Sequence, residues 1–159
     1  GERVEKVTAI LPVAEFREDR YVVMATQNGV VKKTELAAYS NPRAGGIIAM
    51  GVEDGDRLMS AQITDGTGEI FIGSRDGVAI RFPEGDVRPM GRTAYGVKGI
   101  NLREGDQVVA MEVVRPGSTL LTVTENGATR ISRSDLKNQY DFLPEIRSML
   151  QPYQNRLAL

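Results

Sequence analysis

The sequence predicts an all-β protein built from repeats of about 50 residues, and two observations lead to this prediction. β-forming residues interrupted by an Asn-Gly or Asp-Gly pair, the pattern of a β-hairpin, occur three times, at residues 20–34, 69–82 and 118–132. The composition agrees, because 17 glycines and 7 prolines in a chain rich in Val, Ile and Thr are typical of short strands joined by tight turns.

The first repeat begins with a hairpin around Asn28-Gly29. Asn and Gly tolerate the positive φ that a type I′ turn requires at both central positions, so we expect that turn type here. A further turn is expected at Asn41-Pro42. The predicted strands of this repeat are residues 21–26, 30–34, 44–50 and 58–63.

The second repeat has the same order of elements, with a hairpin around Asp76-Gly77, a third strand at residues 97–102 and a fourth at 108–114. A Gly-Asp pair precedes the fourth strand in both repeats, at Gly55-Asp56 and Gly105-Asp106. Four short strands recurring at a fixed period indicate a propeller-like array, in which each four-stranded blade packs against the next. The alternative is an unrelated β-sandwich with similar turns.

The third repeat starts with a hairpin around Asn126-Gly127 but loses the β alternation from Leu136 onward. Pro144 suits the first turn of a helix, so a short C-terminal helix is predicted between Pro144 and Pro152. The chain is thus expected to hold two whole blades plus fragments. The predicted parts are the end of a preceding blade at 1–19, blades at 20–68 and 69–117, the start of a third at 118–136, and a divergent tail at 137–159.

Composition excludes most familiar catalytic sites. The chain of 159 residues is 41% hydrophobic, enough for one domain with a core, but it has no cysteine and no histidine. The remaining carboxylates lie mainly in turn-like stretches, where we expect them to be solvated and to have local backbone roles. We therefore expect no catalytic residues, no metal and no cofactor. The sequence shows no long apolar run and no secretory leader, so we expect no membrane contact and a cytoplasmic location.

The basic residues recur at similar places in the repeats, although the formal net charge is only −1. In an array of blades, equivalent positions fall on one rim, and a basic rim suits the phosphate backbone of duplex DNA. The alternative is that these cations keep outer strands soluble and block edge-to-edge pairing. The candidates on the second strands of the hairpins are Lys32, Lys33, Arg81 and Arg130, and those in the bends are Arg43, Arg88, Arg92 and Lys98.

Several segments also carry a family resemblance, namely VMATQNGVVKKTEL, YSNPRAGGIIA, IRFPEGDVRPMGRTAYGVKGI and TLLTVTENG. Through them, residues 1–127 resemble the C-terminal domain of the DNA gyrase A subunit, and more loosely the matching domain of topoisomerase IV. The resemblance implies a β-pinwheel, a relative of the propeller whose blades exchange strands with their neighbours and whose basic outer rim wraps DNA.

The same resemblance implies a non-catalytic part of an ATP-dependent type IIA topoisomerase that supports DNA supercoiling. The implied partners are duplex DNA, the N-terminal part of gyrase A and the gyrase B subunit. The eight basic candidates match rim positions of that family.

One segment departs from the family, because residues 41–47 read NPRAGGI where the first blade usually has a Gln-Arg-Arg-Gly-Gly-basic-Gly box for wrapping. A protein-interaction or structural module without DNA binding therefore stays open as the alternative function. Incomplete blades also leave open strand edges. We accordingly expect self-association, with residues 4–11 as a strand that pairs into another blade.

Overall fold

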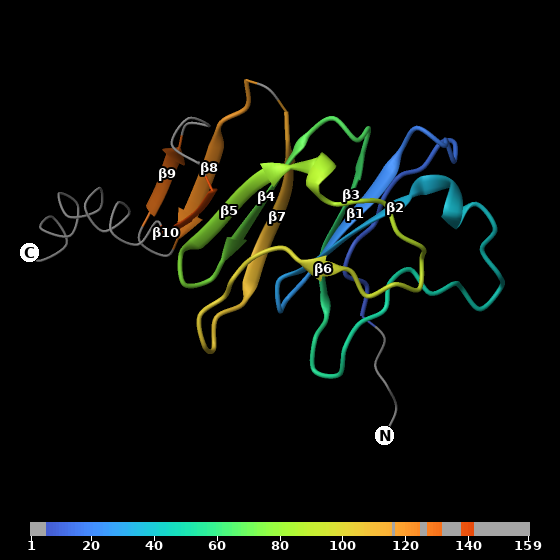
Figure 1. The fold of residues 1–159 in the computed structure, drawn as a ribbon, viewed down its shortest axis with the longest axis horizontal. Helices are drawn as coiled ribbons and strands as arrows, with labels where there is room; N and C mark the ends of the chain where they lie inside the picture. Colours follow the sequence, from blue (N-terminus) through green and yellow to red (C-terminus); the bar gives the residue numbers. More distant parts are fainter. Residues whose placement is uncertain (1–5, 116, 125–126, 132–137, 142–159) are drawn as a thin grey trace, which may run out of the picture.

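The computed structural model describes residues 6–115, 117–124, 127–131 and 138–141, and these form antiparallel sheets (Figure 1). The first sheet has the order β3-β1-β2-β6, the second the order β10-β5-β4-β7, and β8 pairs with β9 alone. The strands of the first sheet are β1 (Tyr21–Thr26), β2 (Val30–Glu35), β3 (Leu58–Thr64) and β6 (Val97–Lys98). Those of the others are β4 (Glu69–Ser74), β5 (Val78–Pro83), β7 (Val108–Val114), β8 (Leu120–Thr124), β9 (Gly127–Ile131) and β10 (Asn138–Asp141). Two short 3-10 helices, η1 (Leu36–Tyr39) and η2 (Glu84–Asp86), follow β2 and β5.

Each four-stranded sheet takes one outer strand from the segment that follows the next hairpin in the chain. Strand β6 belongs to the second repeat but pairs with β2 of the first, with Val97 opposite Val31 and Lys98 opposite Val30. Strand β10 follows the third hairpin and pairs with β5 of the second repeat. The strand exchange that the family resemblance implies is therefore present, and four strands per blade is confirmed.

The predicted third strands need correction. Residues 97–102 form only the two-residue strand β6, and residues 44–50 form no strand. An exchanged strand forms only where it can pair with the free edge of a neighbouring hairpin. Within the described residues, Ile47 and Ile48 pair with no such edge. Residues 6–11 of the predicted N-terminal strand are likewise not in a sheet.

The region after Leu136 also differs from expectation, because β10 lies where the sequence pattern indicated no strand. The predicted helix between Pro144 and Pro152 lies outside the described residues.

The first two hairpin turns are confirmed in position but not in type, and the third includes Asn126, which lies outside the described residues. The Gly29 amide donates to the Thr26 carbonyl at 3.1 Å, so Gln27 and Asn28 are the central residues, and Gly29 follows them with a φ of 86°. The Thr26 hydroxyl accepts from the Val30 amide at 3.2 Å. This arrangement is a three-residue loop with glycine in the left-handed region, and not a type I′ turn. The second hairpin has the same geometry, from Ser74 to Gly77.

The aspartate of each recurring Gly-Asp pair accepts a hydrogen bond from the hairpin turn of the same blade. The Asp56 Oδ1 atom accepts from the Asn28 amide at 3.0 Å, and the Asp106 Oδ1 atom accepts from the Asp76 amide at 3.0 Å. Each carboxylate also accepts from the amide of the next residue. Asp106 is 9% exposed, so the expectation that it is a solvated turn residue with a purely local role is wrong.

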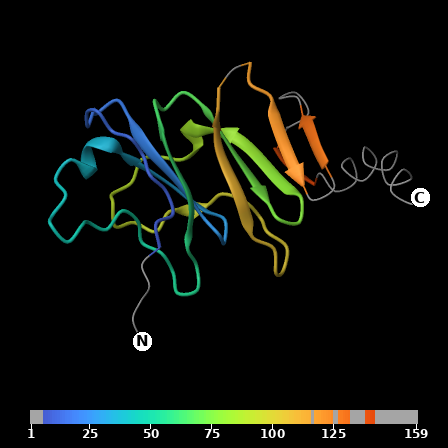
Figure 2. The ribbon, with the colours of Figure 1, turned by 180° about the vertical axis from the view of Figure 1, so that it is seen from behind.

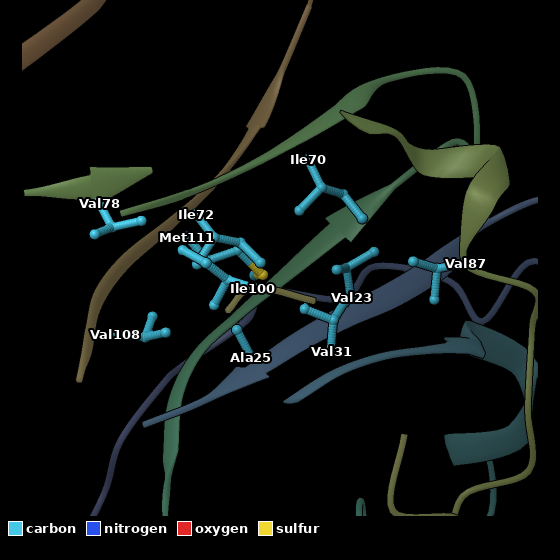
Figure 3. Packing of buried hydrophobic residues seen from close by; sticks show 10 residues of the cluster. All are labelled: Val23, Ala25, Val31, Ile70, Ile72, Val78, Val87, Ile100, Val108 and Met111. Carbon is cyan, nitrogen blue, oxygen red and sulfur yellow. The ribbon is translucent and has the colours of Figure 1, made fainter. Parts of the chain in front are cut away.

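The blades pack through a shared apolar cluster, whose side chains point toward one another between the two sheets (Figure 3). Strands β3 and β7 lie next to each other at this junction, as the view from behind shows (Figure 2). A second buried cluster covers the other face of the first sheet and includes Val22, Met24, Leu36 and Met50. The shared cluster contains Val23, Ala25, Val31, Ile70, Ile72, Val78, Val87, Ile100, Val108 and Met111.

We predict that Asp106→Ala lowers the free energy of unfolding by about 1–3 kcal/mol, because two amides lose their acceptor. Asp106→Asn should cost less, since its amide oxygen can still accept both bonds. Urea unfolding followed by circular dichroism measures the difference. Glu104→Ala, an exposed change in the same turn, is the control. Equal effects of Asp106→Ala and Glu104→Ala would contradict a bound turn.

Candidate nucleic-acid interface

Residues 87–98, here called the rim segment, run along the outer edge of β2. The Met90 amide donates to the Lys33 carbonyl at 2.8 Å, Pro89 forms a parallel bridge with Lys33, and β6 continues the pairing. A segment of the second repeat thereby covers the first blade. It carries three of the predicted cations, Arg88, Arg92 and Lys98.

Residues 41–50, here called the rim loop, contact the rim segment. The Arg92 Nη1 atom donates to the Ile48 carbonyl at 2.8 Å, and the Gly51 amide next to the loop donates to the Ala94 carbonyl at 3.0 Å. Where the two segments meet, they form a hollow of about 480 Å³. Its lining consists of Asn41, Arg43, Gly46, Ile47, Ile48, Arg92 and Thr93.

Four predicted cations are thus brought to the rim. Arg43, Arg88 and Lys98 are exposed, whereas Arg92 is half-buried. Among the described residues, none of the four forms an ion pair with a carboxylate. Their charges are therefore available to an anion, and two of them line one hollow.

Lys32 lies in the interior, because its side chain points from β2 toward the place where the rim loop and the rim segment meet. The residue is 0% exposed, and its Nζ atom donates to the carbonyls of Ala49, at 2.9 Å, and Arg92. Burial, helped by the charge of Arg92, lowers the pKa of the Lys32 amine to about 8. Direct phosphate contact, expected from the sequence, does not agree with this position.

Lys33 is also buried, at 4% exposure, and it joins the two blades. Its Nζ atom donates to the Glu84 carbonyl at 2.8 Å and lies 3.9 Å from the Glu84 Oε1 atom and 5.2 Å from the centre of the Tyr21 ring. The Thr64 hydroxyl donates to Glu84 Oε2 at 2.6 Å. Burial lowers the pKa of Lys33, and the Glu84 charge opposes that shift. The expected phosphate role of Lys33 is replaced by a structural one.

The last two candidates lie on the second strands of the second and third hairpins. Arg81 is half-buried, and its Nη1 atom lies 3.3 Å from Glu69 Oε2, so its charge is already paired. Arg130 belongs to β9, and its side chain lies outside the described part of the structure. Within the described residues, the equivalent hairpin positions Lys32, Lys33 and Arg81 therefore do not form an exposed basic stripe. Strand β2 is covered on both faces and along its outer edge, which leaves the connecting segments to carry the exposed charge.

We predict that Lys33→Met lowers the free energy of unfolding by about 3–5 kcal/mol, because it leaves the buried Glu84 carboxylate without its cation. The double variant Lys33→Met/Glu84→Gln should be more stable than the single one. Chemical unfolding of both variants measures the coupling. Arg17→Met removes an exposed ion pair and serves as the control, with an expected change within about 0.5 kcal/mol. A Lys33→Met protein as stable as that control would contradict the interblade role.

Tandem four-stranded blades that exchange their outer strands are the architecture of a β-pinwheel. The chain belongs to the family of the DNA gyrase C-terminal domain, beta-propeller, whose model matches residues 20–65 and 68–115. The chain is 47% identical over 131 residues to gyrase A of Salmonella typhimurium, and 46% identical over 126 residues to gyrase A of Escherichia coli. These alignments cover 82% and 79% of this chain but only 15% and 14% of the relatives, so the chain spans about a seventh of their length.

Solved structures agree with the sequence relatives. The C-terminal domain of DNA topoisomerase IV matches with a TM-score of 0.79 and 29% identity, over 86% of this chain and 43% of that chain. The DNA gyrase A C-terminal domain matches with a TM-score of 0.70 and 28% identity, over 81% and 43%. In the described part of this chain, no helix has the length and apolar character needed to cross a membrane, and no acidic cluster suits a metal ion.

Proposed function

We propose that this chain is a non-catalytic DNA-binding part of gyrase A, whose basic rim binds the phosphate backbone of duplex DNA. The observation that carries the proposal is a group of four rim cations that have no carboxylate partner in the described part of the chain, namely Arg43, Arg88, Arg92 and Lys98. In the holoenzyme, with the N-terminal part of gyrase A and the gyrase B subunit in the cytoplasm, this binding would support DNA wrapping and supercoiling.

The hollow between the rim loop and the rim segment is the proposed phosphate position. Guanidinium groups bind phosphate oxygens through two parallel hydrogen bonds, and Arg43 and Arg92 both line the hollow. Gly45 and Gly46 have open space where a side chain would be, so the backbone here can come close to a ligand. Contacts of this kind read the shape of the backbone and not the base sequence.

The net charge of −1 determines how this binding should depend on salt. A nearly neutral protein attracts DNA weakly at long range, so the affinity must come from local contacts that release counterions. Such binding weakens steeply with ionic strength.

We predict that four phosphate contacts give a slope of about −3.6 for the logarithm of affinity against the logarithm of salt concentration. Binding should weaken by about 150-fold between 50 and 200 mM salt, as expected for that slope. Fluorescence anisotropy with duplexes of two unrelated sequences measures both values, and the two duplexes should behave alike. Affinity that is independent of salt would contradict the proposal. Absence of binding at low salt would favour the structural module instead.

We also predict that Arg43→Glu weakens duplex binding by about tenfold or more and makes the salt slope shallower by about one, because it replaces a phosphate contact with a repulsive charge. The matched control is Arg57→Glu, the same change at an exposed arginine on the turn before β3. The control should bind nearly as the unchanged chain does. Equal losses in the two variants would show that net charge alone, and not the rim, determines binding.

A further inference from the structure

The buried amine of Lys32 lies between the two segments that form the phosphate hollow. It donates to the carbonyl of Ala49 in the rim loop and to the carbonyl of Arg92 in the rim segment. Ala49 directly follows Ile48, which lines the hollow, and Arg92 lines it as well. One cation is thus bonded to the backbone at both walls.

Two other hydrogen bonds join these two walls. They are the Arg92 Nη1 bond to the Ile48 carbonyl and the Gly51 amide bond to the Ala94 carbonyl. The Tyr39 hydroxyl also donates to the Ala49 carbonyl, at 3.1 Å, but it comes from η1 and does not reach the rim segment. Lys32 differs from these links because it reaches both walls from a sheet strand, β2.

The blade itself does not require a lysine at this position. Lys32 lies opposite Met24 in the first hairpin, and the equivalent residue of the second hairpin is Ile80, opposite Ile72. An aliphatic side chain therefore suits the same strand and register. The hairpin therefore does not need the ammonium of Lys32 in order to form.

We propose that Lys32 is a positioning residue for duplex binding, whose buried ammonium holds the rim loop against the rim segment so that Arg43 and Arg92 face the same phosphate group. This inference rests on the proposed function. Lys32 does not touch DNA in this arrangement. It acts through the backbone that carries the two arginines.

The electrostatic surroundings of Lys32 make this link sensitive to pH. The Arg92 guanidinium, on the rim segment, acts on the Lys32 amine through its charge, and the Tyr39 hydroxyl, on η1, donates to the same Ala49 carbonyl as Lys32. With a pKa of about 8, the amine is mostly charged at pH 7 and mostly neutral at pH 9. Loss of the charge weakens both hydrogen bonds to the carbonyls, so the walls should loosen as pH rises through this range.

The test compares Lys32→Met with Lys98→Met, which removes an exposed rim cation. Removing one phosphate contact makes the salt slope shallower by about one, so Lys98→Met should show that change and Lys32→Met about twice it, because both arginines lose their positions. Without DNA, trypsin should cleave after Arg43 and Arg92 faster in Lys32→Met and at the unchanged rate in Lys98→Met. A folded Lys32→Met protein with the original slope and cleavage rates would overturn the inference. Weaker binding with both readouts unchanged would also overturn it, since that result indicates only lost stability.

The unchanged chain provides an independent measurement, which decides the question if Lys32→Met does not fold. Cleavage after Arg43, divided by cleavage after the exposed Arg17, should rise between pH 7 and 9 with a midpoint near 8. A flat ratio would overturn the inference. Failure of the proposed function is distinguishable, because the unchanged chain would then not bind duplex at all while the trypsin comparison still reports on the link.

Discussion

The pairing of β6 with β2 is the interaction on which the rest of the structure depends. It moves a strand of the second repeat onto the first blade and thereby draws the rim segment across the edge of β2. The approach is close enough to exclude side chains at two positions. A Cβ atom on Gly96 would lie 2.6 Å from the Val31 carbonyl oxygen, and one on Gly99 would overlap the Val31 side chain. Both positions must therefore be glycine for β6 to pair with β2.

This pairing also explains why a Lys-Lys pair in a β-strand becomes internal. Successive side chains of a strand point to opposite faces, so one face would normally leave a lysine in water. Here the rim loop and the rim segment cover Lys32, while η2 of the second repeat covers Lys33. Both amines bind backbone carbonyls of segments far away in the sequence. They join the repeats, and the exposed positive charge lies in the bends.

The sequence was a good guide where local chemistry determines the structure. The Asn-Gly and Asp-Gly pairs identified the hairpins, since only a few residues tolerate the backbone of such loops. Arg43, Arg88 and Lys98 are exposed, as expected for cations in Gly- and Pro-rich bends, but their role as DNA contacts stays a prediction. Burial of Lys32 and Lys33 could not be read in this way, since lysine is rarely buried and their partners are carbonyls, which every residue carries. Strand β10 was missed on similar grounds, because its pairing with β5 uses the main chain and needs no apolar alternation.

The first two repeats share their turn geometry but differ in the side chains at equivalent strand positions. The first and second hairpins have the same loop geometry, and in each an aspartate from the Gly-Asp pair accepts a hydrogen bond from the turn. At the equivalent strand positions, however, the side chains differ. Lys32 corresponds to Ile80, and Lys33 corresponds to Arg81. Lys33 contacts Glu84 across the blade junction, whereas Arg81 pairs with Glu69 on the neighbouring strand. Because the same turns and aspartates recur in both repeats, the same blade accommodates different side chains at equivalent positions of β2 and β5. Under the proposed function, blades of one pinwheel therefore differ in their contacts with DNA according to which cations face inward, as Lys32 and Lys33 do, and which remain exposed in the bends.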